Sequence, residues 1–215
     1  MLFLALALAG TSPPEPDDGQ ATAPPRSPAV EQVSAWIAAS GDNHGHAYLI
    51  VDKPKARIYL FDRDGTPLRD APVLIGRAIG DEATPAIGRK SLAEIGPAEK
   101  TTPAGRFLAR FGRAVGQPVL WVDYADSVAL HTIPPHNKEH RLQRMLSPQI
   151  DDNRITFGCI NVPQDFYRSG VKPMFGKDGG YVYVLPDVKP LETVFPMLAL
   201  QRAPASKEEL AASPR

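Results

Sequence analysis

Between residues 46 and 186 the apolar residues occur in short runs that end at turn residues, and this spacing limits the fold more than any other feature. Two runs within 46–62 flank the turn Asp52-Lys53-Pro54-Lys55. Further strand-like runs occupy residues 71–79, 102–110, 118–122, 127–132, 154–157 and 181–185. Short runs closed by Gly, Pro, Asn or Asp are typical of strands. They predict a mainly β domain, with a mixed β-sandwich or barrel-like sheet and a few short helices.

Helical periodicity is limited to short segments. One stripe of apolar side chains in 29–40 comprises Val30, Val33, Trp36 and Ile37. Because Gly41 follows as a stop signal, we predict a short helix here that packs on the domain. Two further helices are expected at 138–146 and 163–169, whereas the polar segment 80–101 predicts a long loop.

The two ends of the chain differ in composition from this domain. Residues 1–9 are apolar but far fewer than the roughly 20 that a transmembrane helix needs. They resemble the core of a secretory signal peptide, with a small-x-small cleavage site at Ala7-Leu8-Ala9. Residues 10–45 then form a Pro-rich tether and the short helix, and 187–215 a C-terminal extension. We therefore predict an exported protein without a transmembrane segment.

The charge balance excludes one class of partner. The chain has 24 Lys and Arg against 24 Asp and Glu, and no basic block. Proteins that bind nucleic acid carry a basic patch that displaces counterions from the phosphates. We therefore expect no nucleic-acid partner.

The chain has a single cysteine, Cys159. In an exported protein a lone cysteine has no intramolecular disulfide partner, so it is either buried and inert or a working thiol. Asn161 is a good N-cap residue and Pro163 suits a first helical turn, which predicts a helix directly after Cys159. The helix dipole would then lower the pKa of the thiol, and backbone N–H groups of the turn would face a developing oxyanion.

A nucleophilic thiol needs a base, and His131 is the best candidate because it ends the strand-like run 127–132. A zinc site formed by His131, His136 and His140 is the competing interpretation. The chain has no His-Glu-x-x-His motif and no second cysteine, and Pro134-Pro135 interrupts the segment, so we expect no metal and no cofactor.

The order of four motifs resembles the L,D-transpeptidase catalytic domain of the YkuD type. These motifs are the strand–turn–strand unit in 46–62, Thr102-Pro103-Ala104-Gly105-Arg106-Phe107, Leu130-His131-Thr132 and Thr156-Phe157-Gly158-Cys159-Ile160-Asn161. The resemblance covers roughly residues 46–186 and implies the mixed β fold of that family. It also implies a periplasmic or cell-wall location and peptidoglycan stem peptides as the partner.

The resemblance assigns roles by position. Cys159 matches the family nucleophile, His131 the base, and Thr132 the residue whose carbonyl orients the imidazole. Gly158 and the Cys159 amide match the oxyanion-stabilising turn. For substrate binding, the resemblance points to Asn161, and Thr156 lies in the same motif. The nearby charges of Arg141, Arg144 and Arg154 are predicted to be mostly solvated, one of them able to clamp a substrate carboxylate. Of the three, Arg154 and Arg144 are the predicted substrate-binding residues.

Two departures from the family pattern stand out. Phe157 replaces the first residue of the family's His-Gly-Cys motif, and residues 136–154 form an insertion between base and nucleophile. The implied reaction is attack of the Cys159 thiolate on the bond between the L-centre of a diamino acid and D-Ala, followed by transfer of the acyl group to an amine or to water. The alternatives are a catalytically degenerate cell-wall-binding module and a Cys-His hydrolase, such as an L,D-carboxypeptidase or amidase. The segment 134–152 is predicted to lie beside the site as a lid.

Overall fold

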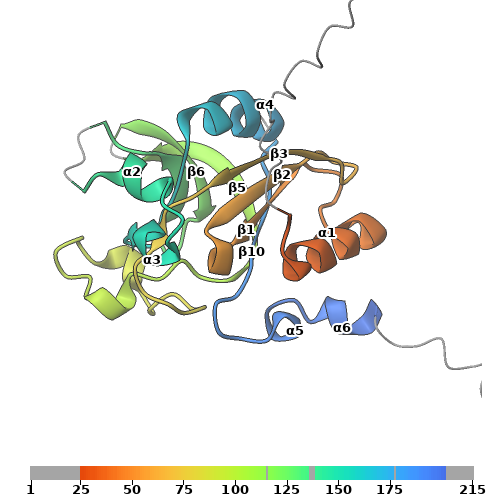
Figure 1. Ribbon diagram of the computed structural model, residues 1–215, viewed down its shortest axis with the longest axis horizontal. Coiled ribbons are helices and arrows are strands. Elements are labelled where there is room, and N and C mark those ends of the chain that lie inside the picture. Colours follow the sequence, from red (N-terminus) through yellow and green to blue (C-terminus); the bar gives the residue numbers. More distant parts are fainter. Residues whose placement is uncertain (1–24, 115, 136–138, 177, 202–215) are drawn as a thin grey trace, which may run out of the picture.

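A computed structural model describes residues 25–114, 116–135, 139–176 and 178–201 (Figure 1). Its main sheet has eight strands in the order β3-β2-β1-β10-β5-β6-β7-β9. Their bounds are β1 Tyr48–Asp52, β2 Arg57–Phe61, β3 Pro67–Pro72, β5 Gly105–Ala114, β6 Gln117–Asp123, β7 Val128–Thr132, β9 Ile160–Val162 and β10 Gly180–Val184. A second, two-stranded sheet joins β4 Ile75–Gly76 to β8 Arg154–Thr156. The signal-peptide-like segment and most of the predicted tether lie outside the described residues.

The sheet is mixed and nearly closed. The β1/β10 and β7/β9 pairs are parallel, and the remaining neighbours in the main sheet are antiparallel. Just after β3, Leu74 exchanges two backbone hydrogen bonds with Asn161 of β9, at 3.0 and 2.9 Å. Because β3 and β9 are the two ends of the strand order, these bonds link the edges into a barrel-like wall. The mainly β, barrel-like fold predicted from the sequence is confirmed.

The helices are short except at the N-terminal side. They are α1 Pro28–Ser40, α2 Arg141–Met145, α3 Ile150–Asn153, a π-helix at Phe166–Val171 that continues into α4 Lys172–Phe175, α5 Leu191–Val194 and α6 Met197–Gln201. The 3-10 turns are Lys53–Lys55, Ile87–Arg89 and Pro97–Glu99. The helix predicted at 29–40 is confirmed: the Ser27 hydroxyl caps its start and Gly41, in the left-handed conformation, ends it.

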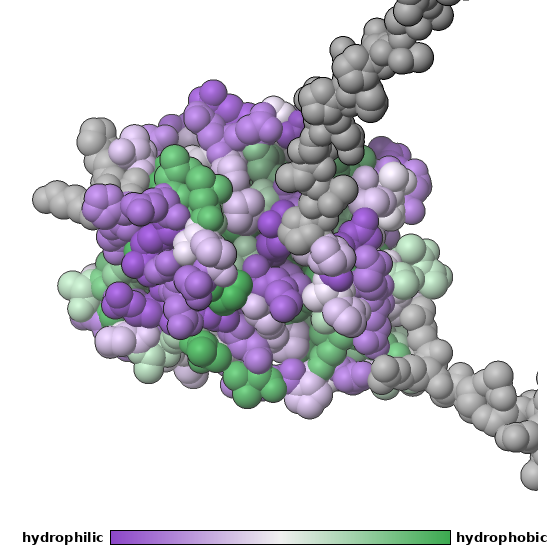
Figure 2. Space-filling view, in the orientation of Figure 1, coloured by the Kyte–Doolittle hydropathy of each residue, from purple (hydrophilic) through white to green (hydrophobic). Residues whose placement is uncertain are grey.

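Two apolar cores hold the sheet. One fills the barrel interior with residues such as Leu49, Leu120 and Val182. The other lies on the outer face of the sheet, where α1, α5 and α6 pack (Figure 1). There Trp36 of α1 meets the Tyr183 ring edge to face at 6.0 Å. Polar side chains cover most of the face in Figure 2, and the apolar ones on it are scattered.

The structure corrects the sequence analysis at three places. Asn161 is not a helix cap, because it pairs with His131 inside the parallel β7/β9 ladder, and helical structure begins only after Pro163. The strand predicted over 71–79 is divided, since β3 ends at Pro72 and β4 covers only Ile75–Gly76. The helix predicted over 138–146 is limited to α2, and residues 136–138 lie outside the described residues.

Candidate active site

Cys159 lies in the turn between β8 and β9, one residue before β9 begins. The β7/β9 register pairs Leu130 with Ile160 and His131 with Asn161. Because side chains alternate along a strand, this register directs Cys159 and His131 to the same face of neighbouring strands, offset diagonally. The sheet thus brings together the two residues that the sequence analysis singled out for catalysis.

The His131 ring has a defined tautomer. Its Nδ1 lies 2.7 Å from the Thr132 carbonyl oxygen. A carbonyl can only accept a hydrogen bond, so Nδ1 carries the proton and Nε2 has the free lone pair. Burial lowers the pKa of His131 more than the Thr132 bond raises it, and the Arg141 charge lowers it further. At neutral pH the imidazole is therefore neutral, and Nε2 is its basic nitrogen.

The thiol of Cys159 is half-buried and donates a hydrogen bond to the Ser127 carbonyl oxygen, at 3.7 Å. Among the described residues, no hydrogen bond joins the sulfur to His131. Burial raises the pKa of the thiol, while the Ala129 N–H, directed at the sulfur, and the Arg141 charge lower it less. The predicted lowering of this pKa by a helix dipole is wrong, because a strand and not a helix follows Cys159.

Asn161 connects the base to a cation. Its side chain is completely buried. Its amide nitrogen lies 3.5 Å from Nδ1 and 3.3 Å from Nε2 of His131, hence over the ring and not in line with the Nε2 lone pair. Its amide oxygen accepts a hydrogen bond of 2.7 Å from Arg141. Arg141 is thus the arginine whose charge reaches both His131 and Cys159. The sequence analysis favoured Arg144 and Arg154, because the long-range contact between α2 and β9 that brings Arg141 to Asn161 is invisible in a single sequence.

The turn that carries Cys159 is held from two sides. The Thr156 hydroxyl donates to the Cys159 carbonyl oxygen at 2.6 Å and accepts the Gly158 N–H at 3.2 Å. On the other side, the Thr102 hydroxyl donates to the Gly158 carbonyl oxygen at 2.8 Å. Gly158 has φ +130°, and a Cβ there would approach the Thr101 carbonyl oxygen to 2.7 Å, so only glycine fits. Since the Gly158 N–H is used within the turn, the Cys159 N–H is the better candidate for the oxyanion donor.

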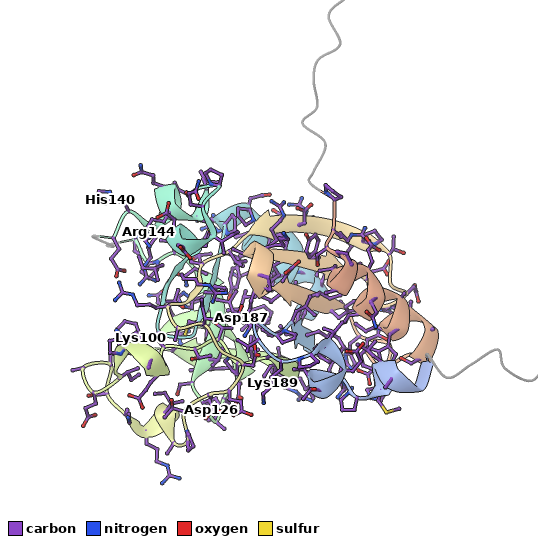
Figure 3. All side chains as sticks on the ribbon, turned by 60° about the horizontal axis from the view of Figure 1, so that its bottom comes forward. Lys100, Asp126, His140, Arg144, Asp187 and Lys189 are labelled. Atoms are coloured by element: carbon purple, nitrogen blue, oxygen red, sulfur yellow. The ribbon has the colours of Figure 1, made fainter. Side chains whose placement is uncertain are left out.

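The remaining predicted substrate-binding residues have internal partners. Arg154 forms an ion pair with Asp187 at 2.5 Å, and its side chain is only 9% exposed. Arg144 donates to the Asp152 carbonyl oxygen at 2.9 Å, and it lies toward the edge of the molecule while Asp187 lies near its centre (Figure 3). Thr156 and Asn161 are buried. Substrate contact by Thr156, Asn161 and Arg154 stays a prediction, since their polar groups already have partners within the protein.

Phe157, at the position of the missing motif histidine, has a cationic neighbour. The Lys100 ammonium nitrogen lies 3.8 Å from the centre of the Phe157 ring. This is the geometry of a cation–π contact. The contact therefore joins the 80–101 loop to the turn that carries Cys159.

Two buried side chains anchor the described part of the insertion between His131 and Cys159, Met145 and Asn153. Met145 is buried with Leu74 and Ile155, and Ile133 packs against them. Asn153 donates to the carbonyl oxygens of Val73 and Met145, at 3.1 and 3.2 Å. The part of the insertion from α2 to α3 is thus fixed to the body, and a lid movement there would expose Met145.

The described residues contain no group of three or more His, Cys, Asp or Glu that could hold a metal ion. His136, one of the three candidate zinc ligands, lies outside them. The helices of the described segments include none long and apolar enough to span a membrane.

A sequence model of the YkuD type, the L,D-transpeptidase catalytic domain, matches residues 46–168. This match covers more than half of the chain and includes His131, Thr132 and Cys159. The chain belongs to the L,D-transpeptidase family. L,D-Transpeptidases of this family are cysteine-dependent enzymes that act on peptidoglycan peptides. A search of proteins with curated function gives no match to this chain.

Proposed function

We propose that this protein is an exported peptidoglycan L,D-transpeptidase in which Cys159 is the nucleophile and His131 the general base. The observation that carries the proposal is the hydrogen bond from His131 Nδ1–H to the Thr132 carbonyl, which leaves Nε2 unprotonated, together with the β7/β9 register that puts Cys159 and His131 on one face. A histidine held in this tautomer beside a cysteine is the arrangement that nucleophilic catalysis requires.

The first half-reaction forms a thioester. The thiol turns from Ser127 to His131, whose Nε2 takes the thiol proton. The thiolate attacks the carbonyl carbon between the L-centre of a diamino acid and the terminal D-Ala, and the Cys159 N–H stabilises the oxyanion. The C–N bond then breaks, and the imidazolium gives its proton to the amine of the departing D-Ala.

The second half-reaction releases the enzyme. An amine of a second stem peptide attacks the thioester while His131 takes one of its protons. The C–S bond breaks, an amide cross-link forms, and the proton returns to the sulfur. Water in place of the amine gives carboxypeptidase action on the same stem.

The neutral state of both groups in the resting enzyme is compatible with this scheme. The pKa of Cys159 is raised and that of His131 is lowered, so proton transfer occurs on substrate binding and not in advance. A resting thiol is also less exposed to oxidation than a thiolate is. The retained orientation of His131 favours an enzyme over a catalytically degenerate wall-binding module.

The test is incubation with a tetrapeptide stem that ends in D-Ala, with and without an amine acceptor. We expect D-Ala release, and a covalent adduct on Cys159 of the stem mass minus D-Ala. Cys159→Ser is the matched control and is expected to release no D-Ala. Release that is equal in Cys159→Ser and wild type would contradict the proposal.

A further inference from the structure

We propose that Thr102 is a positioning residue, whose hydroxyl group aims the Cys159 N–H at the oxyanion by fixing the Gly158–Cys159 peptide group. This inference rests on the proposed function, because it concerns the oxyanion of the same reaction. It assigns a role to a threonine that contacts neither the nucleophile's sulfur nor the base.

The direction of the Thr102 hydroxyl is determined by its two partners. It accepts the Gly76 N–H at 2.8 Å and lies 2.8 Å from the Gly158 carbonyl oxygen. A backbone N–H can only donate and a carbonyl can only accept, so the hydroxyl proton points to Gly158. Thr102 is 2% exposed, and water therefore does not compete for either bond.

A peptide group transmits this constraint to Cys159. The Gly158 carbonyl and the Cys159 N–H belong to one planar trans peptide and point in opposite directions. Fixing the carbonyl toward buried Thr102 therefore directs the Cys159 N–H away from the interior. Gly158 has φ +130° and no side chain to restrict its backbone. The bond from the Thr102 hydroxyl therefore fixes the direction of the Gly158 carbonyl group.

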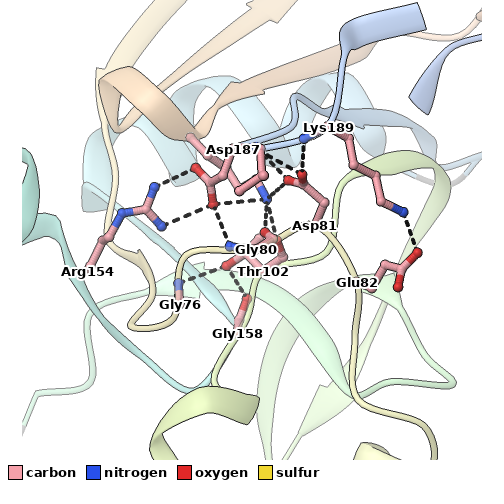
Figure 4. A network of polar contacts seen from close by, with 11 residues as sticks. Gly76, Gly80, Asp81, Glu82, Thr102, Arg154, Gly158, Asp187 and Lys189 are labelled. Carbon is pink, nitrogen blue, oxygen red and sulfur yellow. Dashed lines mark hydrogen bonds and ion pairs between the residues drawn. The ribbon is translucent and has the colours of Figure 1, made fainter. Parts of the chain in front are cut away.

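A buried ion cluster anchors Thr102 in turn (Figure 4). The Lys53 ammonium donates to the Thr102 carbonyl oxygen at 2.9 Å, to the Gly80 carbonyl oxygen at 2.6 Å and to Asp81 at 3.0 Å. It lies 3.3 Å from Asp187, which also pairs with Arg154. Thr102 is thus tied to the cluster by its main chain and to the catalytic turn by its hydroxyl.

Thr101 is the matched control. It is also buried, at 8% exposure, but its side chain lies next to Gly80 and not Gly158. Thr101→Val removes a hydroxyl of the same kind and leaves the main chain in place. Thr102→Ser retains the hydroxyl and is the conservative rescue.

The experiment compares two reactions of Cys159 in wild type, Thr102→Val, Thr102→Ser and Thr101→Val. Acylation by a carbapenem builds an oxyanion, and alkylation by iodoacetamide does not. We expect Thr102→Val to slow acylation about 10- to 100-fold, less than the roughly 10²–10³-fold loss on removing an oxyanion donor, because the Cys159 N–H is misdirected and not removed. We expect alkylation to stay within about twofold of wild type, because no oxyanion is formed. Thr102→Ser and Thr101→Val should acylate at close to the wild-type rate.

The outcomes separate a failure of this inference from a failure of the proposed function. Equal acylation of Thr102→Val and wild type would overturn the inference alone. Slowing of both reactions by the same factor would also overturn it, since that is the result of a general structural defect. Absence of acylation in the wild type would overturn the proposed function and this inference with it. If Thr102→Val does not fold, Thr102→Ala carries the same comparison.

Discussion

Replacement of Lys53 by methionine tests the buried ion cluster that anchors the site. The Lys53 side chain is 1% exposed, and those of its partners Asp81 and Asp187 are 2% and 3% exposed. Methionine keeps most of the side-chain volume, so the change removes the charge and leaves little cavity. Loss of one partner from a buried ion pair costs about 3–5 kcal/mol.

The remaining contacts place the expected cost at the lower end of this range. Asp187 keeps its ion pair with Arg154, and Asp81 keeps hydrogen bonds from the backbone N–H groups of residues 187, 188 and 189. We therefore expect Lys53→Met to lower the free energy of unfolding by about 3 kcal/mol, and the urea midpoint by about 1–2 M.

The assay is urea unfolding at pH 7, with Lys55→Met as control. Lys55 belongs to the same 3-10 turn but is exposed. Its replacement should change the free energy of unfolding by less than about 0.5 kcal/mol. A loss below about 1 kcal/mol for Lys53→Met would refute the claim that this cluster stabilises the fold.

Three further predictions follow from burial and charge. Trp36→Ala should lower the free energy of unfolding in urea by about 3–5 kcal/mol, because Trp36 is 4% exposed and joins α1 to the outer core. A loss below about 1 kcal/mol would show that α1 contributes little to stability. Burial opposes ionisation of Asp81, but hydrogen bonds from Lys189, Asp187, Lys53 and Val188 outweigh it and lower its pKa from 3.8 to about 2. A carboxylate whose pKa is lowered in the folded state stabilises the protein above about pH 4, so about 2 kcal/mol of stability should be lost as the pH falls from about 4 to 2. A free energy of unfolding in urea that does not change over this range would contradict the lowered pKa of Asp81. Because burial raises the pKa of Cys159, its alkylation by iodoacetamide should still accelerate above pH 8; a plateau below pH 7 would indicate a preformed thiolate.

Local patterns in the sequence predicted most of the strands and singled out the two residues to which we assign the reaction. Short apolar runs and turn residues predicted most strands, because local side-chain alternation and turn chemistry operate without long-range information. Cys159 and His131 were predicted as nucleophile and base because each carries a chemistry that few other residues in the chain offer. The resemblance added Thr132, and the hydrogen bond from His131 to its carbonyl is present.

The errors arose where distant segments meet. Asn161 has the local chemistry of a helix cap, but pairing with Leu74 and with β7 places it in a strand. Because a strand follows Cys159, no helix dipole lowers the pKa of its thiol. Arg141 and Thr102 reach the site through contacts with residues 20 and 56 positions away, which no local pattern reveals.

The most direct test of the account is the intact mass of the protein after incubation with a carbapenem. We expect the wild type to gain the mass of the drug, with the adduct mapped to Cys159, and Cys159→Ser to stay unlabelled. His131→Ala should acylate about 10²–10⁴ times more slowly, as expected for loss of a general base. An unlabelled wild type, or an adduct that persists in Cys159→Ser, would contradict the assignment of Cys159 as the activated nucleophile.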